Sequence, residues 1–284
     1  MSAWRAVQAY TPQSHAGDDR AASALPHMIA AAEAAAALIA ARSNHRTGLE
    51  WRTKAHADFV SDVDTDSERL IRDMLLQRVP GASVIGEEFS PEMAPGAGAV
   101  FIVDPLDGTT NFLHGYPEYA VSIGLVLDGV LSAGVVHNAA VGGRFTALLG
   151  RGAQRDGTPI SVSPITDPAK ALIGTGFPFR SFGRVETYLR QFEAVSRGTS
   201  GLRRAGSAAL DLCDVACGRF DGFWELELQP WDFAAGVLIV REAGGVVTTT
   251  AGGDVPFAPS SILAGSPATH EWLLETLRSA APEP

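Results

Sequence analysis

The stretch VDPLDGTTNF, from Val103 to Phe112, places two acids at the end of an apolar run that is typical of a β-strand. Asp104 and Asp107 flank a turn that Pro105 stiffens, so both carboxylates leave the strand close together. Neighbouring carboxylates raise each other's pKa unless a cation neutralises them, and Mg²⁺ prefers carboxylate, carbonyl and water oxygens. The pair therefore predicts a metal site, although a polar loop that caps a helix would use the same residues.

A turn of small residues follows the second acid. Gly108 lets the backbone approach a ligand closely, and the amides of a turn that opens a helix point outward as donors for an anion. The hydroxyls of Thr109 and Thr110 add donors or position a water. This turn predicts a phosphate-binding site. Gly206 and Ser207 start a second predicted helix and indicate either another such turn or an ordinary serine cap.

The chain is acidic, because its 284 residues carry a formal net charge of −10 with neutral histidines. A nucleic-acid surface needs clustered lysines and arginines, and the pair Arg203 and Arg204 is too small for one. We therefore expect no nucleic-acid partner. A phosphorylated small molecule can still bind to a protein of this charge if cations lie between its phosphate group and the acidic side chains.

Several features indicate a cytoplasmic protein with no membrane partner. Cys213 and Cys217 lie on one predicted helix, and we interpret them as small buried residues in a reducing compartment rather than a ligand pair or a disulfide. No apolar stretch follows Arg5, so no signal peptide is expected. The alanine-rich segment from Met28 to Ala41 is shorter than the ~20 residues of a membrane span and predicts a buried core helix.

The pattern of predicted elements changes near residue 165, from mostly antiparallel strands to alternating strands and helices. This change predicts an N-terminal domain over 1–165 and a C-terminal domain over 166–284. In the first part we predict a helix over 25–42 and a second one that Asp62 or Asp64 caps. Residues 99–162 are typical of a mostly antiparallel sheet with a hairpin at Asp128 and Gly129. In the second part strands and helices alternate, which predicts an α/β layer.

Further acids fall at the ends of predicted elements. Glu87 and Glu88 close a short strand, Asp232 opens a helix, and Asp64 lies at the start of another. Catalytic groups gather at such ends, where a rigid scaffold presents loops. Taken singly, each acid also fits a structural role as a solvated turn, a cap or a first-turn acid that the helix dipole favours.

Taken together, these motifs resemble the inositol monophosphatase family of Mg²⁺-dependent, lithium-sensitive phosphatases, and most closely its bacterial inositol-1-monophosphatase branch. The resemblance runs from about Met28 to the end of the chain. It implies an α/β (α+β) fold, a layered αβαβα sandwich of the sugar phosphatase type. The stretches that carry it are KAHADFVSDVD at 54–64, GEE at 86–88, DPLDGTTNF at 104–112, LRRAGSAALDLCDVACGRFDGFWE at 202–225 and PWDFAAGVLIVREAGG at 230–245.

The resemblance also implies roles for single residues. For two to three Mg²⁺ ions, the implied ligands are Glu87, Asp104, Leu106 through its carbonyl, Asp107 and Asp232. The residues implied in catalysis, around the attacking water, are Glu87, Asp64 and Thr109. The residues implied in substrate binding are Asp107, Gly108, Thr109, Gly206, Ser207, Ala208, Glu225 and Asp232.

The implied activity is that of a phosphoric monoester hydrolase. The expected substrate is a small phosphorylated polyol, myo-inositol 1-phosphate, which a metal-activated water would attack directly without a covalent intermediate. The family also implies a homodimer. A non-catalytic metal-binding scaffold would be expected to lack a ligand, whereas every implied ligand is present.

One departure from the family pattern leaves the substrate open. Glu227 stands where many inositol-specific members have glycine, and strand alternation places it on the same face as Glu225 and Gln229. A more acidic pocket would favour the ammonium of histidinol phosphate, which is the main alternative substrate. Fructose 1,6-bisphosphate and 3′-phosphoadenosine 5′-phosphate are further alternatives, but an acidic pocket offers little to a second phosphate or a nucleotide.

Overall fold

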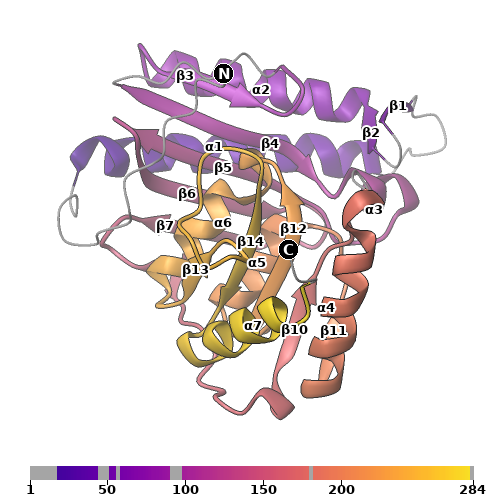
Figure 1. The fold of residues 1–284 in the computed structure, drawn as a ribbon. Coiled ribbons are helices and arrows are strands. Elements are labelled where there is room, and N and C mark those ends of the chain that lie inside the picture. Colours follow the sequence, from indigo (N-terminus) through magenta and orange to yellow (C-terminus); the bar gives the residue numbers. More distant parts are fainter. Residues whose placement is uncertain (1–17, 44–50, 56–57, 90–97, 179–181, 282–284) are drawn as a thin grey trace, which may run out of the picture.

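The protein folds into five layers, in the order helices, sheet, helices, sheet, helices (Figure 1). The computed structural model describes residues 18–43, 51–55, 58–89, 98–178 and 182–281. This order of layers is the αβαβα sandwich that we predict from the sequence. Each sheet is apolar on both faces, so each needs helices on both sides to exclude water.

The larger sheet has seven strands in the order β3-β4-β5-β6-β7-β8-β9, and only β3 and β4 pair in parallel. The antiparallel hairpin between β5 and β6 turns at Asp128 and Gly129, which both have positive φ, at 50° and 85°. The predicted mostly antiparallel sheet and the predicted hairpin are therefore confirmed. The strands are β3 (Ser83–Gly86), β4 (Ala99–Asp107), β5 (Ala120–Leu127), β6 (Val130–Asn138), β7 (Arg144–Leu148), β8 (Ala153–Arg155) and β9 (Thr158–Pro159).

Helix α1 (Asp19–Ser43) packs with α2 (Asp62–Arg78) on the outer face of this sheet. Among the residues that the structure describes, α1 is the one helix long and apolar enough to cross a membrane, so the argument from the length of the segment 28–41 was wrong. One side of the helix, with Ala31, Ala32 and Ala35, is nevertheless fully buried, and α1 packs against α2, β5 and β6 as a core helix does. The helix also begins earlier than predicted, because Asp18 accepts the amide of Arg20 at 2.9 Å.

The cap of α2 differs from the prediction. Ser61, rather than Asp62 or Asp64, is the N-cap residue, and its hydroxyl accepts the amide of Val63. Asp64 completes a capping box by accepting the amide of Ser61 at 2.8 Å. Asp64 is thus held rigidly, with its carboxylate turned back towards the start of the helix.

The smaller sheet has five strands in the order β11-β10-β12-β14-β13. Helices α5 and α6 lie between the two sheets, and α4 and α7 cover the outer face of the smaller one (Figure 1). The elements are β10 (Leu172–Thr175), α4 (Val185–Gly198), β11 (Gly201–Arg203), α5 (Ala208–Ala216), β12 (Gly222–Leu228), α6 (Pro230–Glu242), β13 (Val246–Thr248), β14 (Ser260–Gly265) and α7 (Pro267–Ser279). Short elements complete the chain: β1 (Trp51–Ala55), β2 (Asp58–Ser61), α3 (Thr109–His114), η2 (Pro168–Lys170) and η3 (Phe182–Arg184).

The middle helices approach their neighbours closely because small residues line the contacts. A Cβ added to Gly134 of β6 would lie 2.9 Å from the carbonyl oxygen of Ala235 in α6. A Cβ added to Gly236 of α6 would lie 2.6 Å from Leu212 of α5. All these residues are in or beside one apolar core that includes side chains from both sheets.

The predicted boundary near residue 165 falls between the two sheets. All seven strands of the larger sheet precede it, and all five strands of the smaller sheet follow it. The apolar core around α5 and α6 nevertheless combines residues from both parts, such as Ile102 and Ile262. A division into two domains stays a prediction.

We expect Gly236→Ala to lower the free energy of unfolding by about 1–3 kcal/mol, because the added methyl group overpacks the contact with Leu212. On an exposed helix the same change would stabilise, so the sign of the effect tests the packing. Chemical denaturation measures it. The matched control is Gly253→Ala, where the nearest atom would be an ordinary 3.6 Å away and a change below about 0.5 kcal/mol is expected.

Candidate active site

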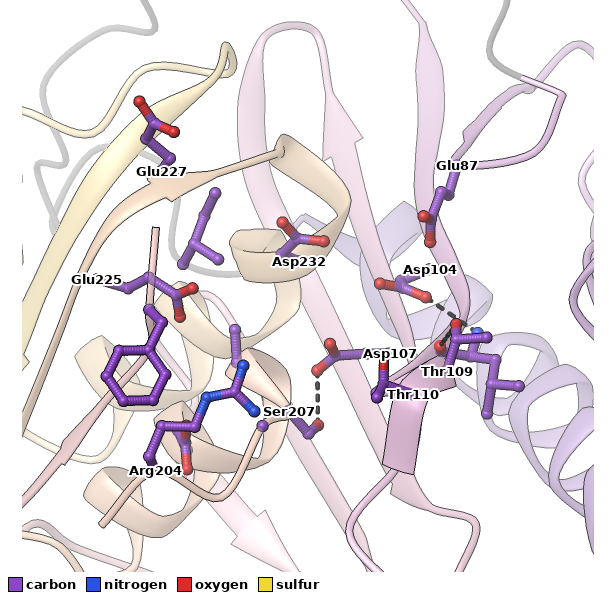
Figure 2. Close-up of a pocket in the computed structure, with 18 of the residues that line it drawn as sticks. Glu87, Asp104, Asp107, Thr109, Thr110, Arg204, Ser207, Glu225, Glu227 and Asp232 are labelled. Carbon is purple, nitrogen blue, oxygen red and sulfur yellow. Dashed lines mark hydrogen bonds between the residues drawn. The ribbon is translucent and has the colours of Figure 1, made fainter. Parts of the chain in front are cut away.

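A cavity of about 340 Å³ opens where β4 ends and where α5 and α6 begin. Its lining residues come from both halves of the chain (Figure 2). All but one of the residues to which the family resemblance gives a role line it, and the exception, Asp64, contacts the lining through Thr109. The predicted residues in the lining are Glu87, Asp104, Leu106, Asp107, Gly108, Thr109, Gly206, Ser207, Ala208, Glu225 and Asp232.

Four acids from three separated stretches face this cavity. Glu87 directly follows β3, whereas Asp104 and Asp107 belong to β4. Asp232 lies in the first turn of α6 and points towards the same space (Figure 2). Asp104 is only 1% exposed, and burial, together with the charges of Glu87, Asp107 and Asp232, raises its pKa well above the ordinary value.

Hydrogen bonds to the backbone fix these acids. The amide of Leu106 donates to Asp104 Oδ1 at 2.9 Å, and the amide of Gln229 donates to Asp232 Oδ2 at 2.7 Å. The turn that carries Glu87 is held from behind by Glu68 of α2. The fully buried Glu68 carboxylate accepts the next two backbone amides, of Glu88 at 2.7 Å and of Phe89 at 3.1 Å.

Asp107 ties the larger sheet to the middle layer of helices. Its Oδ2 accepts hydrogen bonds from the Ser207 hydroxyl at 2.6 Å and from the Ala209 amide at 2.8 Å (Figure 2). The Ser207 hydroxyl also accepts the amide of Leu210 at 3.4 Å as the N-cap of α5. Ser207 is therefore both an ordinary cap and part of the cavity wall, two roles that the residues alone left as alternatives.

The turn after Asp107 has the backbone shape that the sequence indicates. Gly108 adopts φ 93°, a left-handed conformation that favours glycine, and it begins α3. Because α3 has only six residues, the turn offers backbone amides but little helix dipole. The Thr109 hydroxyl donates to Asp64 Oδ1 at 2.8 Å and lies 3.1 Å from the carbonyl oxygen of Leu106. Burial raises the pKa of Asp64 above its ordinary value.

The opposite end of the cavity contains residues that the sequence did not identify as part of the site. The Arg204 guanidinium carbon lies 5.6 Å from the centre of the Phe177 ring, and Glu225 lies nearby (Figure 2). Among the described lining residues, Arg204 is the only cation. In the sequence Arg204 stands out only as half of a basic pair with Arg203, and nothing in the pattern marks Phe177. Asp211 of α5 is a further lining residue that the sequence did not reveal.

Glu227 does line the cavity, on the same side as Glu225, as strand alternation predicts (Figure 2). Its carboxylate, however, forms an ion pair with Arg184, whose Nε lies 3.3 Å from Oε1. The extra acid therefore adds less negative charge to the cavity than the sequence alone indicates.

The chemistry of the donor set fits a hard divalent cation. One buried and three partly buried carboxylates line the cavity beside a carbonyl group, and burial together with their repulsion raises the pKa of Asp104. A cation would remove that repulsion. Among the described residues, no three acids, histidines or cysteines are already drawn together in the arrangement of a metal-ligand cluster. The fit therefore rests on the kinds of groups that meet in the cavity and on their charge.

The five-layered fold, with acids gathered beside a Gly-Thr turn, defines a phosphatase of the sugar phosphatase type. More specifically, the chain belongs to the inositol monophosphatase family, whose model matches residues 22–281. The family prediction is therefore confirmed, together with the coarse class of activity, that of a phosphatase, and this family is metal-dependent.

Relatives and solved structures support this assignment. The chain is 41% identical over 234 residues to an inositol-1-monophosphatase of Rhizobium meliloti, with 82% of this chain and 88% of the relative covered. It is 42% identical over 229 residues to the Nus factor SuhB of Pseudomonas aeruginosa, with 79% and 84% covered. The crystal structure of the extragenic suppressor protein suhB from Bartonella henselae superposes with a TM-score of 0.86 at 40% identity, over 89% of this chain and 98% of that one.

We expect Asp104→Asn to stabilise the metal-free protein increasingly as the pH rises. Because the native pKa of Asp104 lies above the unfolded value of 3.8, the native state binds more protons, and its stability falls as the pH rises above that value. Asparagine does not titrate. In EDTA, the melting temperature of the variant should exceed that of the parent by at least about 2 °C at pH 8 and by less near pH 5.

The control for this comparison is Asp73→Asn on the exposed face of α2, for which no change is expected. If the parent protein were as stable as Asp104→Asn in EDTA at every pH, the repulsion inferred for the cavity would be absent.

Proposed function

We propose that the protein is a Mg²⁺-dependent phosphomonoesterase that hydrolyses myo-inositol 1-phosphate to inositol and phosphate. The observation that carries this proposal is the convergence of Glu87, Asp104, Asp107 and Asp232 on one cavity, beside the turn at Gly108 and Thr109. The acids alone would repel a phosphate, so an anionic substrate requires cations between the two.

Glu87, Asp104 and the Leu106 carbonyl would hold one Mg²⁺, and Asp104, Asp107 and Asp232 a second. When bound, such ions neutralise the charges of the carboxylates and the phosphate and lower the pKa of a water molecule. A third, weaker ion near Glu87 is part of the same proposal. The backbone amides at Gly108 and Thr109 would orient the phosphate oxygens.

Thr109 and Asp64 would orient the attacking water and favour the loss of its proton. The Thr109 hydroxyl hydrogen is directed at Asp64 and at the Leu106 carbonyl, so the lone pairs of Thr109 Oγ1 remain able to accept a hydrogen bond from water. Burial makes the Asp64 carboxylate a stronger base than usual. The pair would thus orient the water and favour loss of its proton as the bond to phosphorus forms.

The other end of the cavity supports a polyol rather than an ammonium as the leaving group. Glu225 can accept hydrogen bonds from hydroxyl groups, and Arg204 can donate to them. Arg204 would also repel an ammonium, and Arg184 already compensates the charge of Glu227. We therefore rank histidinol phosphate below inositol phosphate. Fructose 1,6-bisphosphate and 3′-phosphoadenosine 5′-phosphate stay further candidates.

The names of the relatives indicate two different functions. One relative is named an inositol-1-monophosphatase and another a Nus factor. For this chain we propose no direct nucleic-acid binding, because its net charge is −10 and such binding relies on clustered cations. A cytoplasmic location, lithium sensitivity and a homodimer are further proposals that rest on the family resemblance, and light scattering in solution tests the last of them.

A panel of four phosphate esters tests the proposed function. With Mg²⁺, myo-inositol 1-phosphate should give a higher kcat/KM than histidinol phosphate, fructose 1,6-bisphosphate or 3′-phosphoadenosine 5′-phosphate, and EDTA should abolish every rate. Asp104→Asn should lower kcat at least about a thousandfold, because an electrostatic group at the reacting centre is lost. Circular dichroism checks that the variant keeps its fold, and a folded variant with parental turnover would refute the assignment of Asp104.

Breaking the ion pair between Arg184 and Glu227 should change the substrate preference. In Arg184→Ala, the freed Glu227 carboxylate should raise kcat/KM for histidinol phosphate relative to inositol phosphate by about two- to fivefold, the range for a largely exposed pair. The control is Arg190→Ala, which breaks an ion pair with Glu186 elsewhere on α4 and should leave the ratio unchanged. An unchanged ratio in Arg184→Ala would show that Glu227 does not affect selectivity.

A further inference from the structure

Asp211 is a buried acid that the roles assigned so far leave unexplained. It lines the cavity, yet it is only 2% exposed, and no described residue donates a hydrogen bond to its Oδ1. Its backbone amide does bond normally, to the carbonyl oxygen of Ser207 at 2.9 Å. A buried carboxylate oxygen without a donor is costly, and native proteins seldom contain one without a functional reason.

The position of Asp211 on α5 explains why its side chain reaches the cavity. Ser207 and Ala208 lie four and three residues before it, so all three share one helix face, and all three line the cavity. The two hydrogen bonds that Asp107 accepts from Ser207 and Ala209 hold this first turn in place. Glu225 lines the same cavity, and after burial its charge is the largest cause of the raised pKa of Asp211.

Two other acids in this part of the fold, Asp214 and Asp221, have structural roles and can be compared with Asp211. Asp214, one turn further along α5, accepts a hydrogen bond from Arg219 at 2.9 Å. Asp221 also has one buried oxygen without a donor, but its Oδ2 accepts the amide of Leu172 at 2.6 Å. Neither residue lines the cavity. Asp211 combines burial, an unsatisfied oxygen and a place in the cavity wall.

We infer that Asp211 is a substrate-binding residue, whose carboxylate accepts a hydrogen bond from a hydroxyl group adjacent to the one that Glu225 binds. The inference rests on the proposed function and narrows it. Two neighbouring acceptors at the far end of the cavity select a polyhydroxylated monophosphate with at least two hydroxyl groups beyond the ester. An ester without hydroxyls would offer no donor to Asp211 Oδ1, to which no described residue donates either.

The experiment compares Asp211→Leu and Asp211→Asn with the parent and with Asp214→Asn as the matched control on the same helix. The substrates are myo-inositol 1-phosphate and p-nitrophenyl phosphate, which has no hydroxyl groups. In Asp211→Leu, KM for the inositol ester should rise about tenfold more than KM for the aryl ester, the loss expected for a hydrogen bond to a charged group. Asp211→Asn, which keeps one acceptor, should lie between Asp211→Leu and the parent.

Thermal unfolding supplies a second measurement that does not depend on turnover. Both Asp211 variants should raise the melting temperature of the substrate-free protein by about 2–4 °C, because they remove an unsatisfied buried carboxylate. Asp214→Asn should lower it, because it removes the negative charge of the ion pair with Arg219, and should leave the ratio of the two KM values unchanged.

The outcomes separate the inference from the proposed function. A parent protein that does not hydrolyse myo-inositol 1-phosphate overturns both. An active parent overturns the inference alone if Asp211→Leu raises both KM values equally, or if it lowers the melting temperature, which would show that Asp211 supports the fold instead of the substrate.

Discussion

The hydrogen bonds of Asp107 connect the two halves of the site. This carboxylate ends a strand of the larger sheet and holds the first turn of α5 through Ser207 and Ala209. Asn111 adds a second connection, because its amide donates to the carbonyl oxygens of Glu118 at 2.7 Å and Ala205 at 2.9 Å. The cavity walls therefore come from different layers, yet they are fixed to each other within one hydrogen-bonded network. Any movement of α5 relative to the larger sheet would open the cavity and expose its acids.

Acids held together in this way cost stability, which the rest of the fold must offset. Burial and three like charges act on Asp104, and Asp211 is buried without a donor for one oxygen. The five layers enclose three apolar cores, so a large buried area is available to compensate. Asp104 and Asp211 thus depart from the rule that buried charges are paired, and such exceptions in a cavity wall are typical of functional sites.

The sequence reveals those parts of the site whose signal is local. Asp104, Asp107 and the Gly-Thr turn are close along the chain, so their proximity follows from spacing alone. The antiparallel sheet and the alternation of strands and helices follow from the sequence pattern, and the order of the layers from the family resemblance. The start of α1 and the cap of α2 depend instead on single side chains, Asp18 and Ser61. Arg204, Phe177 and Asp211 could not be found in this way. Which side of α5 or of the loop after β10 faces a cavity is decided by packing between distant layers, and spacing does not record it.

Both strands that carry site residues depart from regular pairing at the cavity. The register of β4 against β5 shifts between Asp104 and Asp107, and that of β12 against β14 shifts between Glu225 and Leu228. Such irregularities redirect side chains and free backbone groups from the ladder. In β4 the freed carbonyl oxygens accept hydrogen bonds from hydroxyl groups instead. The Pro105 carbonyl accepts one from Ser67, and the Leu106 carbonyl accepts one from Thr109. The interrupted pairing thus lets a buried strand turn two acids and a carbonyl towards the cavity, which a regular strand, alternating its side chains between two faces, could not do.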